Sequence, residues 1–154
     1  MTSSADSAGP TTSGRRRAGA PRAHGIDEIL AAAREGVDRV EPGELAALMA
    51  EGAHVVDIRP ARTREPEGHL PGATVIDRLV LEWRLDPASA HRMEGGPSYE
   101  DLVVVVCNEG YYSSLAARDL RDLGFSRATD LVGGFRAHAA AGLPTQAEPA
   151  REVL

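Results

Sequence analysis

A run of apolar residues from Leu102 to Val106 most constrains the fold of this chain, and the only cysteine, Cys107, follows it directly. A short run without polar alternation is typical of a strand that is buried on both faces of a sheet. A polar turn containing Gly110 comes next, and an amphipathic helix is predicted from Ser113 to Leu123. The segment therefore predicts a buried strand, a tight loop and a helix, with the cysteine at the carboxyl end of the strand.

This arrangement favours a reactive role for Cys107. A loop that leads into a helix directs several backbone N–H groups at whatever lies on it, and the helix dipole adds partial positive charge there. A thiol held in that field ionises more readily, which makes Cys107 a candidate nucleophile. The alternative is that a lone cysteine at a strand end is a small buried hydrophobe, as such cysteines usually are. The loop and the helix that follow favour the nucleophile.

The rest of the sequence alternates short apolar strands with helices. Helices are predicted from Ile26 to about Gly36, from Pro42 to Gly52, from Ser113 to Leu123 and from Phe135 to Ala141; strands at Val55–Ile58, Ala73–Ile76, Leu102–Val106 and Arg127–Val132; and a polar loop over residues 60–74. This pattern predicts an α/β fold in which a small, mostly parallel sheet carries helices on both faces. Ligands of such sheets bind at the carboxyl ends of the strands, where Cys107 lies.

The length of the chain limits the number of domains, and its charge limits the kinds of partner that it can bind. A chain of 154 residues predicts one domain, here residues 25–150, and residues 1–24 are too poor in large apolar side chains to order themselves. That predicted disordered tail carries four arginines against one aspartate, so the remainder is more acidic than the net charge of −6. An acidic body of this kind argues against nucleic-acid binding. With one cysteine and no long apolar segment, a cytoplasmic protein is expected. The absence of lysine indicates a bacterial, GC-rich coding bias.

Other chemistry finds little support. The histidines lie far apart without ligand spacing and one cysteine cannot build a thiolate site, so no metal and no cofactor is predicted. No phosphate-binding glycine motif appears. Asp57 and Arg59 are interpreted as a structural ion pair at a strand end, because a carboxylate in an apolar strand needs a partner. His69, in a turn rich in proline and glycine, is expected to fix that turn by hydrogen bonding.

Four separate stretches together resemble the rhodanese family. They are DIR at Asp57–Arg59, EGHLPGA at Glu67–Ala73, CNEGYYSS beginning at Cys107, and LVGGF at Leu131–Phe135. The resemblance spans roughly Val40 to Pro144, and the pair formed by EGHLPGA and the strand-terminal cysteine is its specific signal.

The resemblance implies a rhodanese-like fold and a sulfurtransferase. Cys107 would take the outer sulfur of a donor such as thiosulfate, hold it as a persulfide, and pass it to a thiol or cyanide acceptor. The predicted substrate-binding loop comprises Asn108, Glu109, Gly110, Tyr111, Tyr112 and Ser113. Ser113 and Ser114 are expected to cap the helix or to donate hydroxyls to the bound sulfur. The expected partners are a small-molecule sulfur donor and a thiol acceptor. A protein persulfide is an alternative donor. Neither nucleic acid nor a membrane is expected as a partner.

One departure from the family keeps alternatives open. Many rhodaneses carry arginine where this chain has Tyr112, and the loop also holds the acid Glu109, so the identity of the sulfur donor is not settled by sequence. Four arginines are candidates to supply the positive charge that would bind an anionic sulfur donor, namely Arg59, Arg62, Arg64 and Arg78. The other hypothesis is a non-catalytic binding or regulatory module on the same fold. A cysteine-dependent phosphatase is disfavoured, because Ser113 stands where a phosphate-clamping arginine would be needed.

Overall fold

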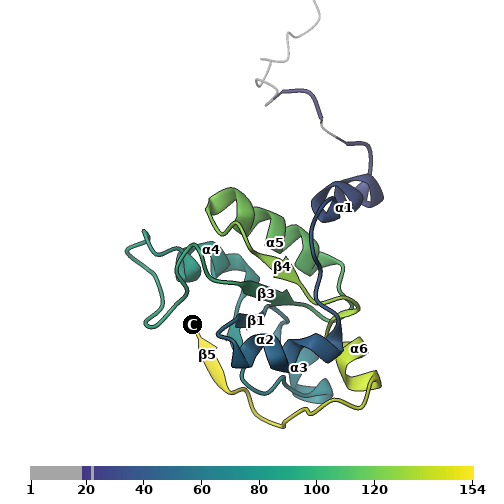
Figure 1. The fold of residues 1–154 in the computed structure, drawn as a ribbon, viewed down its shortest axis with the longest axis vertical. Helices are drawn as coiled ribbons and strands as arrows, with labels where there is room; N and C mark the ends of the chain where they lie inside the picture. The colour runs from purple at the N-terminus through teal and green to yellow at the C-terminus, as the bar shows by residue number, and fades with distance from the viewer. Residues whose placement is uncertain (1–18, 22) are drawn as a thin grey trace, which may run out of the picture.

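Five parallel strands form a single sheet in the computed structural model, which describes residues 19–21 and 23–154. The strand order is β4-β3-β1-β2-β5. Figure 1 shows β4, β3 and β1 side by side, with β5 at the far edge. The strands are β1 (His54–Asp57), β2 (Thr74–Ile76), β3 (Val103–Val106), β4 (Thr129–Asp130) and β5 (Arg151–Val153). The helices are α1 (Ile26–Arg34), α2 (Leu45–Ala50), α3 (Ala61–Glu67), α4 (Leu81–Leu85), α5 (Tyr112–Leu123) and α6 (Gly134–Ala140), with 3-10 turns η1 (Pro42–Glu44) and η2 (Arg78–Val80). The predicted α/β class with a parallel sheet is confirmed.

Helices cover both faces of the sheet because β3 is apolar at every position. Val103 and Val105 face one layer, in which α4 and α5 pack through Leu81 and Leu120. Alternate residues point the other way, so Val104 and Val106 contact the opposite layer, which α2 and α6 supply. The strand is therefore fully buried, as the unbroken apolar run predicts.

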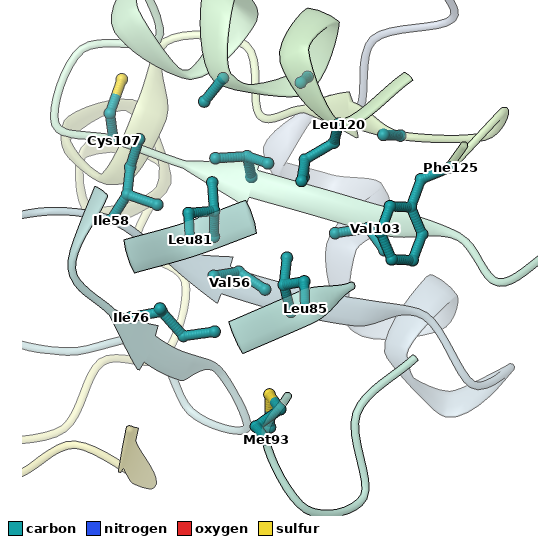
Figure 2. Packing of buried hydrophobic residues seen from close by; sticks show 14 residues of the cluster. Val56, Ile58, Ile76, Leu81, Leu85, Met93, Val103, Cys107, Leu120 and Phe125 are labelled. Atoms are coloured by element: carbon teal, nitrogen blue, oxygen red, sulfur yellow. The ribbon is translucent and has the colours of Figure 1, made fainter. Parts of the chain in front are cut away.

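Cys107 lies at one end of the first of these two layers. Figure 2 shows its side chain beside that of Ile58, while Met93 and Phe125 lie toward the opposite end of the cluster. β1 and β3 are in register from His54 with Val103 to Asp57 with Val106. The residues that follow these two strands therefore emerge side by side at the carboxyl edge of the sheet.

The polar loop predicted for residues 60–74 is wrong, because α3 occupies Ala61–Glu67. Its Pro66 lies in the last turn, where a missing N–H removes only one helical hydrogen bond, and Gly68 ends the helix at a φ of 103°. The buried Arg64 fastens the helix by donating from Nε to the carbonyl of Arg59 at 2.9 Å. Arg64 Nη2 also lies 3.4 Å from Glu152 of β5, so a tertiary contact helps to stabilise a helix that local composition disfavours.

The strand β5 was not predicted either. Residues Arg151–Val153 pair with β2 in parallel and form the edge of the sheet, beyond the limit predicted for the domain at residue 150. The exact limits of the domain stay a prediction. The predicted disordered tail lies outside the described residues except for 19–21, 23 and 24.

The N-terminal helix α1 lies against α5 at the side of the domain (Figure 1). Arg121 of α5 fastens it by donating from Nη2 to the carbonyl of Ala33 at 2.7 Å. Beyond α1 the chain reaches Val40, which bridges to Leu131 in parallel. This path carries Arg34 and Arg39 behind the cysteine loop. None of the helices in the described part of the chain is long and apolar enough to cross a membrane.

Candidate active site

The sulfur of Cys107 is held by the loop that follows it. The backbone N–H groups of Gly110 and Ser113 donate to Sγ at 3.2 and 3.3 Å. The thiol in turn donates to Ser113 Oγ at 3.2 Å. Cys107 is 8% exposed, so its sulfur lies at the edge of the core and is still reachable from outside. Two N–H donors and the N-terminus of α5 therefore surround the position at which a sulfur anion would lie.

The loop keeps this orientation because its carbonyl groups are bound on the outside. The N–H groups of Phe135 and Arg136, at the start of α6, donate to the carbonyls of Cys107 at 2.9 Å and Asn108 at 3.0 Å. Gly110, with a φ of 80°, turns its own carbonyl away from the sulfur. With these carbonyls directed outward, the N–H groups of the loop are left free to turn toward the sulfur.

Two arginines from the N-terminal segment bind the carbonyl of Gly110. Arg34 Nη2 donates to it at 2.7 Å and Arg39 Nη2 at 3.0 Å. Arg34 also donates from Nε to Ser114 Oγ at 2.9 Å. Together these side chains form what we call the arginine clamp, Arg34 and Arg39, which fixes the back of the cysteine loop.

Asp130, the last residue of β4, connects the clamp to the loop. Its carboxylate accepts from Arg39 Nε at 2.8 Å and from the hydroxyls of Ser113 at 2.8 Å and Ser114 at 2.7 Å. Asp130 is 2% exposed, and this set of donors satisfies a buried charge. The expectation that the two serines cap α5 is wrong, because α5 has no side-chain cap and both hydroxyls donate to Asp130. Donation to a bound sulfur stays a prediction.

The buried pair of Asp57 and Arg59 lies on the other side of the cysteine. Arg59 Nη2 lies 2.7 Å from Asp57 Oδ2, and both side chains are 1% exposed. Arg59 also donates to the carbonyl of Gly68 at 2.9 Å, and its guanidinium lies 3.9 Å from the ring centre of Phe135. This geometry agrees with the structural ion pair expected from the sequence.

A hollow of about 300 Å³ opens above Cys107. Its wall is mostly apolar and includes Ile58, Pro60, Tyr111 and Tyr112. The remaining lining residues are Arg59, Cys107, Asn108 and Glu109. Tyr111 and Tyr112 are 60% and 51% exposed and form its rim. A reactant of modest size can therefore approach the sulfur past a rim of two aromatic side chains.

One ionic cluster borders the mouth of the hollow. Arg136 Nη2 lies 3.1 Å from Glu67 Oε1, and its Nη1 is paired with Glu109. The hydrogen bond from Arg136 holds the pKa of Glu67 below its usual value, and the same bond raises the pKa of Arg136. Asn108 also contacts Glu67, at 3.5 Å. One guanidinium is thus shared by two carboxylates.

Every residue of the predicted loop, Asn108 to Ser113, lies beside the sulfur or at the mouth of the hollow. Of the arginines considered for cationic help, Arg59 lines the hollow but is paired, Arg64 is buried against Arg59 and Glu152, and Arg62 is exposed. His69 fixes its turn through its backbone, which pairs with Gln146, rather than through its ring. Burial lowers the pKa of that ring, whose Nδ1 has no partner.

Sequence reasoning missed the arginine clamp, Asp130 and Arg136. Asp130 had a usable signal, because a carboxylate at the end of a short strand, like Asp57, points to a neighbouring ligand at the carboxyl edge. The arginines had none, since nothing local distinguishes them from solvated surface residues. Among the described residues no three His, Cys, Asp or Glu side chains gather as a potential metal site.

The fold and the site define a class of small α/β proteins with a cysteine in an N–H-lined loop at the carboxyl edge of a parallel sheet. The model of the Rhodanese-like domain family matches residues 41–141. The chain therefore belongs to the rhodanese family.

Relatives and solved structures agree with this assignment. The thiosulfate sulfurtransferase GlpE of Pseudomonas entomophila is 36% identical over 97 residues, which is 63% of this chain and 80% of that protein. Human single-domain sulfurtransferase TSTD1 is 30% identical with a TM-score of 0.58, covering 68% of this chain and 97% of that one. A Rhodopseudomonas palustris protein of unknown function, described as a possible tyrosine phosphatase, is 30% identical with a TM-score of 0.68. The match covers 83% of this chain and 100% of that one.

We expect Arg34→Gln to slow the reaction of Cys107 more than its effect on stability explains. The substitution removes two charge-assisted hydrogen bonds and should lower the free energy of unfolding by about 1–3 kcal/mol. It also leaves the Gly110 carbonyl with Arg39 as its one remaining donor in the clamp. The initial rate of sulfur loading onto Cys107, measured well below the melting temperature, should therefore fall about tenfold.

The matched control is Arg121→Gln. Arg121 fastens α1, and its hydrogen bonds go to the carbonyls of Ala33 and Ala128 rather than to the loop from Cys107 to Ser113. A comparable loss of stability with a normal loading rate is expected. Equal loading rates in the two variants would show that the clamp merely holds α1 in place.

Proposed function

We propose that this chain is a sulfurtransferase that moves sulfane sulfur from a donor to a thiol or cyanide acceptor through a persulfide on Cys107. The observation that carries the proposal is the pair of N–H donors, from Gly110 and Ser113, directed at the sulfur of a reachable cysteine. Membership of the rhodanese family supports it, as do relatives named thiosulfate sulfurtransferases in bacteria and in Arabidopsis thaliana.

The loop from Asn108 to Ser113 would act as the substrate-binding loop. In the first step the Cys107 thiolate attacks the outer sulfur of the donor, the bond between that sulfur and the rest of the donor breaks, and the remainder leaves with the electron pair. In the second step the acceptor attacks the same sulfur and restores the thiolate. The loop N–H groups would stabilise the anionic persulfide between the steps, because no basic residue lies in the loop to do so.

The test is intact-mass spectrometry under non-reducing conditions, before and after exposure to thiosulfate or a persulfide. A gain of about 32 Da, one sulfur atom, is expected on the wild type and not on Cys107→Ser. Addition of cyanide or a thiol should remove that mass and release thiocyanate or a new persulfide. A loaded Cys107→Ser variant, or a wild type that no donor loads, would contradict the proposal.

A phosphatase function, which the description of the Rhodopseudomonas palustris protein raises, has less support. Phosphoryl transfer at a cysteine needs a guanidinium that clamps the phosphoryl oxygens in the loop itself. The loop from Asn108 to Ser113 contains no arginine, and the arginine clamp binds the Gly110 carbonyl from behind. The non-catalytic binding module is the remaining alternative, favoured by the exposed aromatic rim of Tyr111 and Tyr112.

We further propose that the reaction takes place in the cytoplasm. A sulfur-carrying cysteine has to be kept free of adventitious disulfides, and reducing thiols maintain that state there. Those same thiols are suitable acceptors for the sulfur.

A further inference from the structure

We propose that the Cys107 site selects sulfane-sulfur donors that carry an apolar body and at most one negative charge, and that it disfavours the inorganic dianion thiosulfate. This inference names the substrate class of the site and rests on the proposed sulfurtransferase function. Three observations carry it: the wall of the hollow, the pairing of its only lining arginine, and the charges around its mouth.

The wall suits an organic group. The wall next to the cysteine is mostly apolar, and its lining includes Ile58, Pro60, Tyr111 and Tyr112. The two tyrosines are exposed. An apolar group that leaves water for this hollow is stabilised by the hydrophobic effect and by contact with the aromatic faces. A small, strongly hydrated dianion gains nothing from the same surfaces.

The apolar surface also continues beyond the rim. A second hollow, of about 330 Å³, lies between α1 and α5 on the other side of the two tyrosines. Ile26, Leu30 and Leu115 line it together with Tyr111 and Tyr112, and Asp27 is its only charged residue. Donors longer than the first hollow therefore have an apolar path to follow.

The only arginine that lines the first hollow offers no net charge. Both carboxylate oxygens of Asp57 accept from Arg59, and a second acceptor is the carbonyl of Gly68. Arg59 Nη1 has no hydrogen-bond partner, but it is a buried atom that solvent does not reach. An anion in the hollow thus meets a neutral, buried ion pair instead of a free guanidinium.

The charge on the Glu109 side of the mouth is net negative. Arg136 is shared by Glu67 and Glu109 on one side. On the other side Arg78, whose guanidinium lies 5.7 Å from the ring centre of Tyr112, is shared by two further carboxylates. Those carboxylates, Glu82 and Asp119, each lie 2.6 Å from an Arg78 nitrogen. Arg118 lies 3.1 Å from Asp119 as well, so the cluster around Arg78 is neutral. The cluster around Arg136 holds one cation against two anions, and like charge disfavours a dianion more than a monoanion.

The chemistry of transfer is the same for every sulfur donor of this class. With a thiosulfonate, the Cys107 thiolate attacks the terminal sulfur, the bond between the two sulfurs breaks, and a sulfinate leaves with the electron pair. With an organic persulfide a thiolate leaves instead. Charge is conserved in both cases, and no oxidant or reductant is needed.

Three reagents separate the effects of charge and of apolar body. Benzenethiosulfonate is a monoanion with a phenyl group, methanethiosulfonate is a monoanion with a methyl group, and thiosulfate is a dianion without an apolar body. Initial rates of sulfur loading would be measured by intact mass at low donor concentration. Each rate would be divided by the rate of the same reagent with N-acetylcysteine, which removes differences in intrinsic reactivity.

We expect the normalised rates to fall in the order phenyl, methyl, thiosulfate, with about tenfold or more between the first and the last, equivalent to about 1.4 kcal/mol. Tyr112→Ala should bring the phenyl rate toward the methyl rate. Glu109→Gln should raise the thiosulfate rate about two- to fivefold at low salt, an effect that vanishes at high salt. The matched control is Glu51→Gln, because Glu51 is an exposed acid just before β1, at the opposite end of the sheet.

The outcomes distinguish the inference from the function on which it rests. If all three reagents load Cys107 and thiosulfate is as fast as or faster than benzenethiosulfonate after normalisation, the inference is wrong and the sulfurtransferase stands. If no reagent loads the cysteine, the proposed function fails and the inference falls with it. Loading that prefers the phenyl donor but is unchanged by Tyr112→Ala would also overturn the assigned site.

Discussion

Replacing Arg59 with methionine is expected to lower the free energy of unfolding by about 3–5 kcal/mol. The side chain of Asp57 is 1% exposed, so the substitution would leave its charge buried without a counter-ion. The carbonyl of Gly68 would lose a donor, and the guanidinium would be removed from the face of Phe135. Urea denaturation of both proteins at neutral pH provides the measurement.

Two further variants make the Arg59 result specific. Arg62→Met removes an exposed arginine from α3, a few residues further along the chain, and should change stability by less than about 0.5 kcal/mol. The double variant Asp57→Ala with Arg59→Met should lose less than the sum of the single losses, because no unpaired charge remains. A loss below about 1 kcal/mol for Arg59→Met, or strict additivity in the double variant, would contradict this account of the pair.

Replacing Gly134 with alanine should be the most damaging single change at the cysteine loop. A Cβ at this position would lie 2.5 Å from the carbonyl oxygen of Cys107 and 2.7 Å from the carbonyl of Asn108. These are backbone atoms that cannot rotate away, so the loop itself has to shift. We expect a loss of about 3 kcal/mol in stability. We also expect the rate of sulfur loading to fall tenfold or more, because a shift of the loop displaces the reactive sulfur from its position for attack.

Gly36→Ala separates the clash from backbone strain. Gly36 has a φ of 68°, close to the 63° of Gly134, but no atom lies within 4 Å of its added Cβ. The free energy of unfolding of this variant should therefore fall only by the strain of a left-handed alanine, about 1 kcal/mol. Its rate of sulfur loading should stay normal. Equal losses in the two variants would mean that strain alone, and not contact with the loop, explains the role of Gly134.

The sequence by itself determined the part of the site that is contiguous in the chain. The apolar run before Cys107, the turn at Gly110 and the helical pattern after it specify a strand, a loop and a helix through nearest neighbours alone. The buried sulfur and its N–H donors follow from that local geometry. The ion pair of Asp57 and Arg59 was also predictable, since a carboxylate in an apolar strand needs a nearby cation.

Only the tertiary structure decided which distant groups hold the loop in place. Arg34, Arg39 and Asp130 come from segments separated by about 90 residues in the sequence, and their meeting depends on the order in which the strands pair. The same cause redirects the hydroxyls of Ser113 and Ser114, because a buried carboxylate takes the donors nearest to it. The secondary structure of residues 61–67 and 151–153 was also decided by tertiary contacts. Their local composition gives a weak preference, and burial of Arg64 and pairing with β2 supply the rest. Local interactions are encoded by neighbours in the chain, whereas packing partners are selected only when the sheet brings remote segments together.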